Sequence, residues 1–243
     1  MSHMELEIQN HIAIVTMHYG ENRLNPRFLE SFNDMLDRIE HETEATALVV
    51  TSAHEKIFCN GIDLAWLIPV VKSGDIKSVK DYIYMLNRSM RRLVLYPLLT
   101  VAAINGHAFA GGAVMSSCFD FRFMRAERGF FCLPEVNLGV PFTPGMTAVL
   151  GKAIPRFMLE DLEYSGKRLT PGQCEQYHII TKACPMETLM QEVLLFAGNL
   201  NKRREIVQAL KQEMNKDIVR VLDVEDPERI ESGWDKWFTD QVA

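Results

Sequence analysis

Two features near the middle of the chain could do chemistry: a glycine turn ahead of a helix, and a lone carboxylate. Ala110-Gly111-Gly112 is expected to form a tight turn that leads into a helix of small apolar residues, 113–118. Amides at a helix start lack intrahelical acceptors, so they can point at an anion or an oxyanion. Further along, Glu135 stands among apolar residues. Apolar surroundings raise the pKa of a carboxyl group, as a general base near neutral pH requires.

Alternating strands and helices are predicted to position these groups. Residues 4–18 alternate as a hairpin that turns near Gln9-Asn10, and Pro26 begins an amphipathic helix through residue 39. A buried strand at 47–51 follows, and this strand–helix–strand order is typical of a βαβ unit.

Further elements of the same kind lead into and out of the glycine turn. Asp75 is expected to cap a helix that ends before Pro97, and strands are predicted at 100–104, 120–124 and 130–132. Helices follow at 143–154 and 155–164. Then comes a loop at 165–171, in which Thr170 caps the next helix.

The C-terminal part of the chain is predicted to be helical, without the alternating strands of the earlier part. After a short strand at 179–184, successive helices are predicted at 186–199, 201–221 and 226–238. We therefore divide the chain into a core, 4–185, and a helical C-terminal region, 186–243. The region is interpreted as a lid or an oligomerisation element.

Composition limits the possible functions. The chain has 243 residues, 47% of them hydrophobic, which suits one globular domain or one domain with an appendage. A net charge of −6 disfavours a broad nucleic-acid surface, and no apolar run is long enough for a membrane span. Five scattered cysteines form neither a metal pattern nor a disulfide framework, so reduced thiols are expected. With no secretory signal and no terminal Ser-Lys-Leu, we expect a cytoplasmic protein.

Three motifs, in this order and spacing, resemble the crotonase superfamily of enoyl-CoA hydratases and isomerases. They are FCNGIDL at 58–64, INGHAFAGGAVMSSCFDFRF at 104–123 and LPEVNLGVP at 133–141. The resemblance implies an α/β fold, a spiral of ββα turns with a helical C-terminal region, assembled as a homotrimer or hexamer. It also implies an acyl-CoA thioester substrate. Neither a metal nor a redox cofactor is expected, because coenzyme A arrives as part of the substrate.

The same resemblance assigns roles to residues. The backbone N–H groups of Ile62 and Gly111 would form an oxyanion hole for the thioester oxygen, and Glu135 would be the catalytic residue. The substrate-binding positions that it implies are Asn60, Gly61, Arg23 and Gly112.

One departure from the family pattern bears on the reaction. Hydratases of the superfamily carry a second glutamate three residues after the glycine of the hole, where this chain has Val114. Valine can neither deprotonate water nor protonate carbon. Moving a double bond from C3–C4 to C2–C3 needs only one base, so the pattern favours a Δ3,Δ2-enoyl-CoA isomerase. The segment 141–146 also departs from the family pattern, which leaves the shape of the acyl pocket open.

Other interpretations stay open. Hydration, thioester hydrolysis or decarboxylation would need a group that the sequence does not identify, and a non-catalytic acyl-CoA-binding subunit would keep the fold without turnover. Glu135 would then only cap a turn, and Arg23 would be a solvated surface residue. Several other polar residues and side-chain stripes are interpreted as structural: Asp63 as a helix cap, Asp120 as a hydrogen-bond acceptor, His107 as a turn histidine, 202–204 as a solvated basic face, and the Phe and Met stripes as core.

Overall fold

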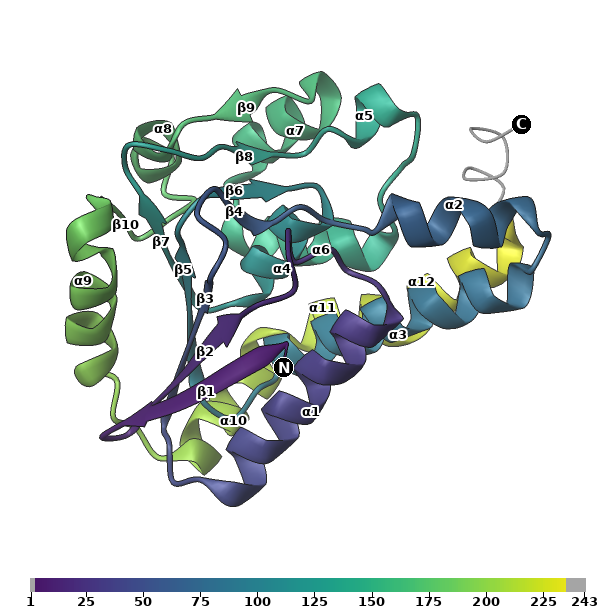
Figure 1. Cartoon of the computed structure of the whole chain (residues 1–243). Coiled ribbons are helices and arrows are strands. Elements are labelled where there is room, and N and C mark those ends of the chain that lie inside the picture. Colours follow the sequence, from purple (N-terminus) through teal and green to yellow (C-terminus); the bar gives the residue numbers. More distant parts are fainter. Residues whose placement is uncertain (1–2, 235–243) are drawn as a thin grey trace.

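The computed structural model describes residues 3–234 of the chain (Figure 1). Its larger sheet has the strand order β1-β2-β3-β5-β7-β10. The first pair, β1 and β2, is antiparallel, and the other pairs are parallel. The strands are β1 (Met4–Gln9), β2 (Ile12–Met17), β3 (Ala47–Ser52), β5 (Leu99–Ile104), β7 (Phe121–Arg125) and β10 (Lys182–Cys184).

A smaller sheet has the order β4-β6-β8-β9, from β4 (Ile57–Cys59), β6 (His107–Phe109), β8 (Phe131–Cys132) and β9 (Arg168–Leu169). Along the chain, β3 is followed by β4, β5 by β6, and β7 by β8. Each of these pairs places one strand in each sheet, and helices connect successive pairs. This repeat is the predicted spiral of ββα turns.

Both faces of the larger sheet are covered, so its central strands are mostly apolar. Ile12 and Ile14 of β2 face the helix α9 (Met186–Gly198), whereas Ala13 and Val15 face the main core. Figure 1 shows α9 on one side of the sheet and α1, α3 and α4 on the other. The helical region predicted at 186–243 thus begins with a helix that completes the core of the sheet.

The remaining helices pack around these two sheets. Before the glycine turn they are α1 (Pro26–Glu42), α2 (Leu64–Lys72) and α3 (Ile76–Val94). After it come α4 (Gly111–Cys118), α5 (Glu135–Leu138), α6 (Pro144–Ala153), α7 (Arg156–Ser165) and α8 (Pro171–Gln176). The last are α10 (Arg204–Met214), α11 (Lys216–Arg220) and α12 (Asp226–Arg229), with π-helical turns at Val221–Glu225 and Ile230–Trp234.

Predicted helix caps are confirmed. Asp63 and Asp75 accept from the backbone N–H three residues on, at 3.3 and 3.1 Å. Thr170 forms a reciprocal capping box with Gln173. Asp120 is the predicted structural acceptor, since its carboxylate accepts from the N–H of Thr100 at 2.8 Å.

Four predictions need correction. His107, predicted as a turn histidine satisfied by backbone, lies in the strand β6 instead, although its ring Nδ1 does accept from the backbone N–H of Phe130 at 3.2 Å. The loop at 165–171 contains β9. The helix predicted at 201–221 is broken at Asn215 between α10 and α11. Finally, Arg204 is not a solvated residue, because it donates to three carbonyls that follow α1 or end it. The predicted end of the last helix, 235–238, lies outside the described residues.

Candidate active site

The glycine turn brings α4 close to the loop after β4. Ala110 adopts φ 53° and ψ −127°, a strained conformation for a residue with a Cβ, and Gly111 then begins the helix. Gly112 has no room for a side chain, since a Cβ there would lie 2.2 Å from the carbonyl oxygen of Cys59. Gly61 has φ +74°, and a Cβ there would lie 2.9 Å from the amide nitrogen of Gly111. These glycines permit two backbone turns to touch.

The loop that carries Ile62 is held through the residues on either side of Ile62, which bond to a segment distant in sequence. Leu24 donates its N–H to the Gly61 carbonyl at 2.8 Å, and its own carbonyl accepts from the Asp63 N–H at 3.0 Å. Tyr82, which is buried, donates its hydroxyl to that same Leu24 carbonyl at 2.6 Å. The position of the Ile62 amide is therefore fixed by backbone and side-chain hydrogen bonds.

Two backbone donors remain free where these turns meet. In residues 3–234, neither the Ile62 N–H nor the Gly111 N–H donates to a protein acceptor. A Cβ at Gly111 would lie 3.5 Å from the Ile62 nitrogen, so the two amides are neighbours. Adjacent free amides can bind an oxygen atom that gains negative charge, in the manner of an oxyanion hole.

Glu135 is the first residue of α5, which ends at Gly139 in a left-handed conformation. Part of the residue is exposed, but its carboxylate oxygen Oε2 is buried and has no hydrogen-bond partner among the described residues. Burial raises the pKa of Glu135 to about 8, and the nearby carboxylate of Glu163 contributes to the rise. A carboxylate with this pKa can take up and release a proton near neutral pH.

These groups line one open cleft of about 300 Å³. It brings together five of the predicted residues: Ile62, Gly111, Glu135, Asn60 and Arg23. Its other walls are largely apolar, from Leu64, Ile68, Phe109, Leu138, Val140, Phe142 and Met146, among others. Gly61 and Gly112 are not on its wall and act through the close packing described above.

Arg23 and Asn60 are joined at one side of this cleft. The Arg23 guanidinium pairs with Glu21 at 2.7 Å, and the Asn60 amide donates to the same carboxylate at 3.1 Å. The hydrogen bond from Asn60 and the charge of Arg23 lower the pKa of Glu21. Glu21 was not identified from the sequence, where its spacing from Asn60 gives no signal.

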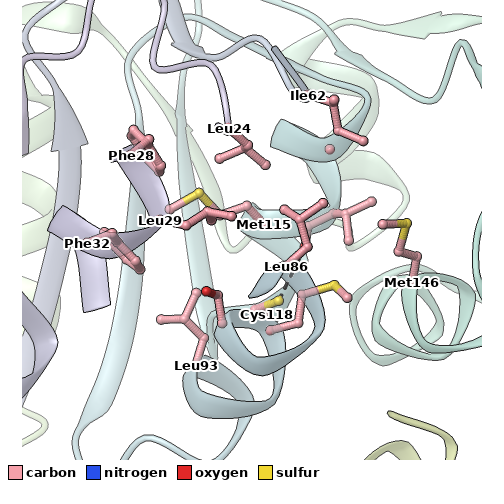
Figure 2. A pocket seen from close by; sticks show the side chains of 14 residues that line it. Leu24, Phe28, Leu29, Phe32, Ile62, Leu86, Leu93, Met115, Cys118 and Met146 are labelled. Carbon is pink, nitrogen blue, oxygen red and sulfur yellow. Dashed lines mark hydrogen bonds between the residues drawn. The ribbon is translucent and has the colours of Figure 1, made fainter. Parts of the chain in front are cut away.

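A second cavity, which the sequence assigned to the core, continues inward from the cleft. It is a narrow apolar pocket of about 30 Å³ between α1, α3 and α4 (Figure 2). Ile62, Gly111 and Met146 line both cavities, so the two meet beside the free amides. Val114 lines the inner pocket and is 2% exposed.

The cysteines lie in the interior of the protein. All five are free and buried. Burial raises the pKa of Cys59 and of Cys118 to about 12, so neither thiol is an activated nucleophile. None of the described helices is long and apolar enough to cross a membrane.

Comparison with known proteins gives consistent matches over the chain. The family model for enoyl-CoA hydratase/isomerase matches residues 7–227. Enoyl-CoA delta isomerase 3 of Arabidopsis thaliana is 26% identical over 213 residues, covering 84% of this chain and 88% of the relative. Crotonyl-CoA hydratase of Syntrophomonas wolfei is 25% identical over 231 residues, covering 90% of this chain and 85% of the relative.

Solved structures agree on the fold. An enoyl-CoA hydratase from Bacillus halodurans superposes with a TM-score of 0.87 at 21% identity, covering 99% of both chains. An enoyl-CoA isomerase from Mycobacterium tuberculosis gives 0.85 at 20% identity, covering 96% of this chain and 99% of the other. The family match and the shared crotonase fold together place this chain in the enoyl-CoA hydratase/isomerase family of the crotonase superfamily.

Proposed function

We propose that the protein is a Δ3,Δ2-enoyl-CoA isomerase, which moves the C3–C4 double bond of an acyl-CoA to C2–C3. Glu135 serves as the only proton-transferring group, and the Ile62 and Gly111 amides bind the thioester oxygen. The single observation that carries the proposal is the charge pattern of the cavity walls. Within residues 3–234, Glu135 is the only carboxylate that lines either cavity.

The proposed reaction begins with proton removal from C2 by the Glu135 carboxylate. The electrons of the C2–H bond form the C1–C2 double bond of an enolate, whose oxygen accepts from the two free amides. Protonated Glu135 then returns the proton to C4, and the C2–C3 double bond forms as the carbonyl is restored. Proton, charge and electrons balance with no water and no further reactant.

The inner wall supports isomerisation over hydration. Adding water needs groups that hold and deprotonate a water molecule, and the wall of the inner pocket offers the buried, apolar side chain of Val114. A water molecule at such a wall would lack hydrogen-bond partners. Among the relatives, both names occur, enoyl-CoA delta isomerase 3 and crotonyl-CoA hydratase, so hydration is the second candidate.

The test supplies trans-3-hexenoyl-CoA and follows the absorbance of the conjugated enoyl thioester. We expect conjugation by the wild type, its loss in Glu135→Gln, and little hydration of crotonyl-CoA in parallel. Conjugation that survives Glu135→Gln would remove the proposed base. Rapid hydration of crotonyl-CoA with no conjugation would replace the isomerase by a hydratase.

The proposal includes further properties of the working enzyme. Coenzyme A is part of the substrate, and the reaction as written uses neither a metal nor a redox cofactor. Arg23, in the cleft wall, is proposed to approach the coenzyme A portion, with Asn60 beside it. A homotrimer or hexamer, a cytoplasmic location and a lid or oligomerisation role for residues 186–243 stay predictions, which sedimentation velocity and cell fractionation would check.

A further inference from the structure

We propose that Asp226, at the start of α12, is a positioning residue for the cleft: its carboxylate holds the segment 139–146, which forms part of the cleft wall. On the proposed function, on which this inference rests, that wall contacts the acyl-CoA substrate. The C-terminal region then has a role besides the predicted lid or oligomerisation element, because one of its helices fixes a wall of the site.

The segment 139–146 connects the helix of the base, α5, to the helix α6. It begins at Gly139, where α5 ends, and includes the first turn of α6. Four of its residues line the cleft: Val140, Pro141, Phe142 and Met146. Residues 139–143 belong to neither a helix nor a strand, so contacts with other elements fix the course of this part of the wall.

Asp226 accepts three hydrogen bonds, and two of them come from this segment. Its Oδ1 accepts from the Gly145 N–H at 2.6 Å, and its Oδ2 accepts from the Thr143 hydroxyl at 3.1 Å. The third donor is the side-chain amide of Asn87 on α3, at 3.2 Å. Asp226 is 1% exposed, and burial raises its pKa, while the bonds from Gly145 and Thr143 act in the opposite direction. A buried carboxylate is costly unless donors compensate it, so these contacts explain how the residue is tolerated here.

The same contacts determine where α6 begins. Thr143 is the N-cap of this helix, and its Oγ1 accepts from the Met146 N–H at 3.3 Å while its proton is donated to Asp226. The Gly145 N–H belongs to the first turn, where amides have no acceptor within the helix, and Asp226 supplies one. Asp226 thus caps α6 a second time, from a distant helix, and so fixes Met146 at the cleft wall.

Gly145 fits closely against the carboxylate. A Cβ at Gly145 would lie 2.4 Å from the Asp226 Oδ2 and 2.4 Å from the Leu222 Cδ2. Only a residue without a side chain therefore lets Asp226 reach the N–H at this position. The segment that departs from the family pattern, 141–146, is thus the one that Asp226 holds.

The backbone just before Asp226 forms a π-helical turn. The Asp226 N–H donates to the carbonyl of Val221, five residues earlier, instead of to one four residues earlier. A bond of the same kind to the Leu222 carbonyl would need an N–H at Pro227, which has none. Asn87 supplies a donor instead, because its side-chain amide donates to the Leu222 carbonyl at 2.9 Å as well as to Asp226. Asn87 therefore fixes both this turn and the carboxylate that follows it.

Ion pairs on either side of Asp226 hold the C-terminal helices along α3 (Figure 1). Arg91 pairs with Asp223 at 2.8 Å. Lys80 pairs with Glu231 at 2.7 Å. Both pairs are partly exposed, and exposed ion pairs contribute little to stability. The buried hydrogen bonds of Asp226 are therefore the contacts that connect this part of the chain to the cleft wall.

The test combines hydrogen exchange, which needs no substrate, with binding and kinetics. In Asp226→Ala, the backbone amides of residues 139–149 should exchange at least about tenfold faster, whereas β3 should exchange as in the wild type. The Kd for hexanoyl-CoA and the KM for trans-3-hexenoyl-CoA should rise about tenfold, the effect of losing one hydrogen bond to a charged group. The change in kcat should stay below about twofold, because the segment carries neither the base nor the two amides. A general loss of folded protein would instead lower kcat and leave KM unchanged.

Two variants and one control complete the design. Asp226→Asn keeps one oxygen for the Gly145 N–H, so it should recover part of the lost affinity. Gly145→Ala disturbs the same contact from the other side, so it should reproduce the faster exchange and the higher Kd. Gly151→Ala is the matched control, since Gly151 is also on α6 but has open space around its Cβ position, and it should change neither value.

Two results would overturn the inference: exchange in residues 139–149 at the wild-type rate in Asp226→Ala and Gly145→Ala, or faster exchange with the Kd for hexanoyl-CoA unchanged. If Asp226→Ala does not fold, Asp226→Asn and Gly145→Ala decide in its place. Hexanoyl-CoA does not react, which separates this inference from the proposed reaction. A wild type that binds hexanoyl-CoA but never conjugates 3-enoyl-CoA would reject the isomerase, and exchange and Kd would still decide the role of Asp226.

Discussion

Replacing Glu135 with glutamine should abolish turnover and at the same time stabilise the protein at alkaline pH. The carboxylate oxygen Oε2 is buried without a hydrogen-bond partner among the described residues, and burial raises its pKa from 4.5 to about 8. Glutamine has nearly the same shape but never ionises. The substitution therefore isolates the cost of holding a negative charge at this place.

The sign and size of the effect follow from linkage. A group whose pKa is higher in the native state than in the unfolded state favours folding below the unfolded pKa, and loses that contribution as pH rises through the native pKa. The wild type should therefore lose stability between pH 4.5 and about 8, whereas Glu135→Gln should not. At about 1.4 kcal/mol per pKa unit, the advantage of the variant in free energy of unfolding approaches about 5 kcal/mol above about pH 9.

The assay is urea unfolding of both proteins at about pH 5 and about pH 9, followed by circular dichroism. A difference in the free energy of unfolding that is the same at both pH values reports the different hydrogen bonding of the amide. Only the part of this difference that changes with pH tests the burial argument. Glu30→Gln, at an exposed position on α1, is the control and should show no comparable change. Unfolding curves of wild type and Glu135→Gln that differ equally at both pH values would refute the burial argument. In the same pH range, kcat/KM of the wild type should rise as the carboxyl ionises.

Three further predictions test the surroundings of the base. Glu163→Gln should lower the pKa of Glu135, because a neighbouring negative charge is removed; the rising limb of the pH–rate profile should then move to lower pH. Gly61→Ala should lose more than tenfold in kcat, since a Cβ would meet the backbone of the glycine turn at 2.9 Å. Gly20→Ala, at a similar positive φ but with open space, should cost only about 1 kcal/mol of stability and leave kcat unchanged. Tyr82→Phe removes the hydroxyl that donates to the Leu24 carbonyl and so helps to hold the loop of the Ile62 amide. We expect kcat to fall a few fold while KM changes little. An unchanged kcat would mean that the backbone hydrogen bonds alone hold the loop.

Local signals in the sequence predicted much of the fold. Helix starts with a side-chain acceptor, as at Asp63 and Asp75, satisfy their own N–H groups within three residues, so they can be read without knowledge of distant contacts. Buried parallel strands are likewise visible as apolar runs. The apolar neighbours of Glu135 predicted a raised pKa, and burial in the folded chain raises it.

Features that depend on distant partners were missed. The strands β6 and β9 have three and two residues, too few for a periodic pattern, and they exist because β8 lies between them. Arg204 sits in a run of charges typical of a solvated face, yet it donates to carbonyls near residues 40–45. Those carbonyls end or follow α1, where helix geometry leaves acceptors unsatisfied.

The inner pocket was missed for a related reason. Cys118 and Leu93 lie at the helical spacing that is also typical of a packed core. Nothing in the sequence of either helix alone distinguishes a core residue from one that lines a pocket. The distinction arises when three helices meet with an incomplete fit. Cavities are properties of tertiary packing, so a single sequence gives no local signal for them.

The site is nevertheless marked by unsatisfied chemistry that folding normally avoids. Among the described residues, three buried side-chain atoms lack hydrogen bonds, in His11, Asn105 and Glu135, and only Glu135 lines either of the cavities that meet at the amides. In that cleft the backbone adds two amides that find no acceptor within residues 3–234, beside a strained Ala110. Such local costs persist where the surrounding structure holds them in place for function. The cleft thus places donors that lack an acceptor in the same cavity as a carboxyl group that can ionise near neutral pH. On the proposed function, a thioester with an acidic C2–H bond is the partner of both: its oxygen accepts from the amides, and its C2 proton goes to the ionised carboxylate.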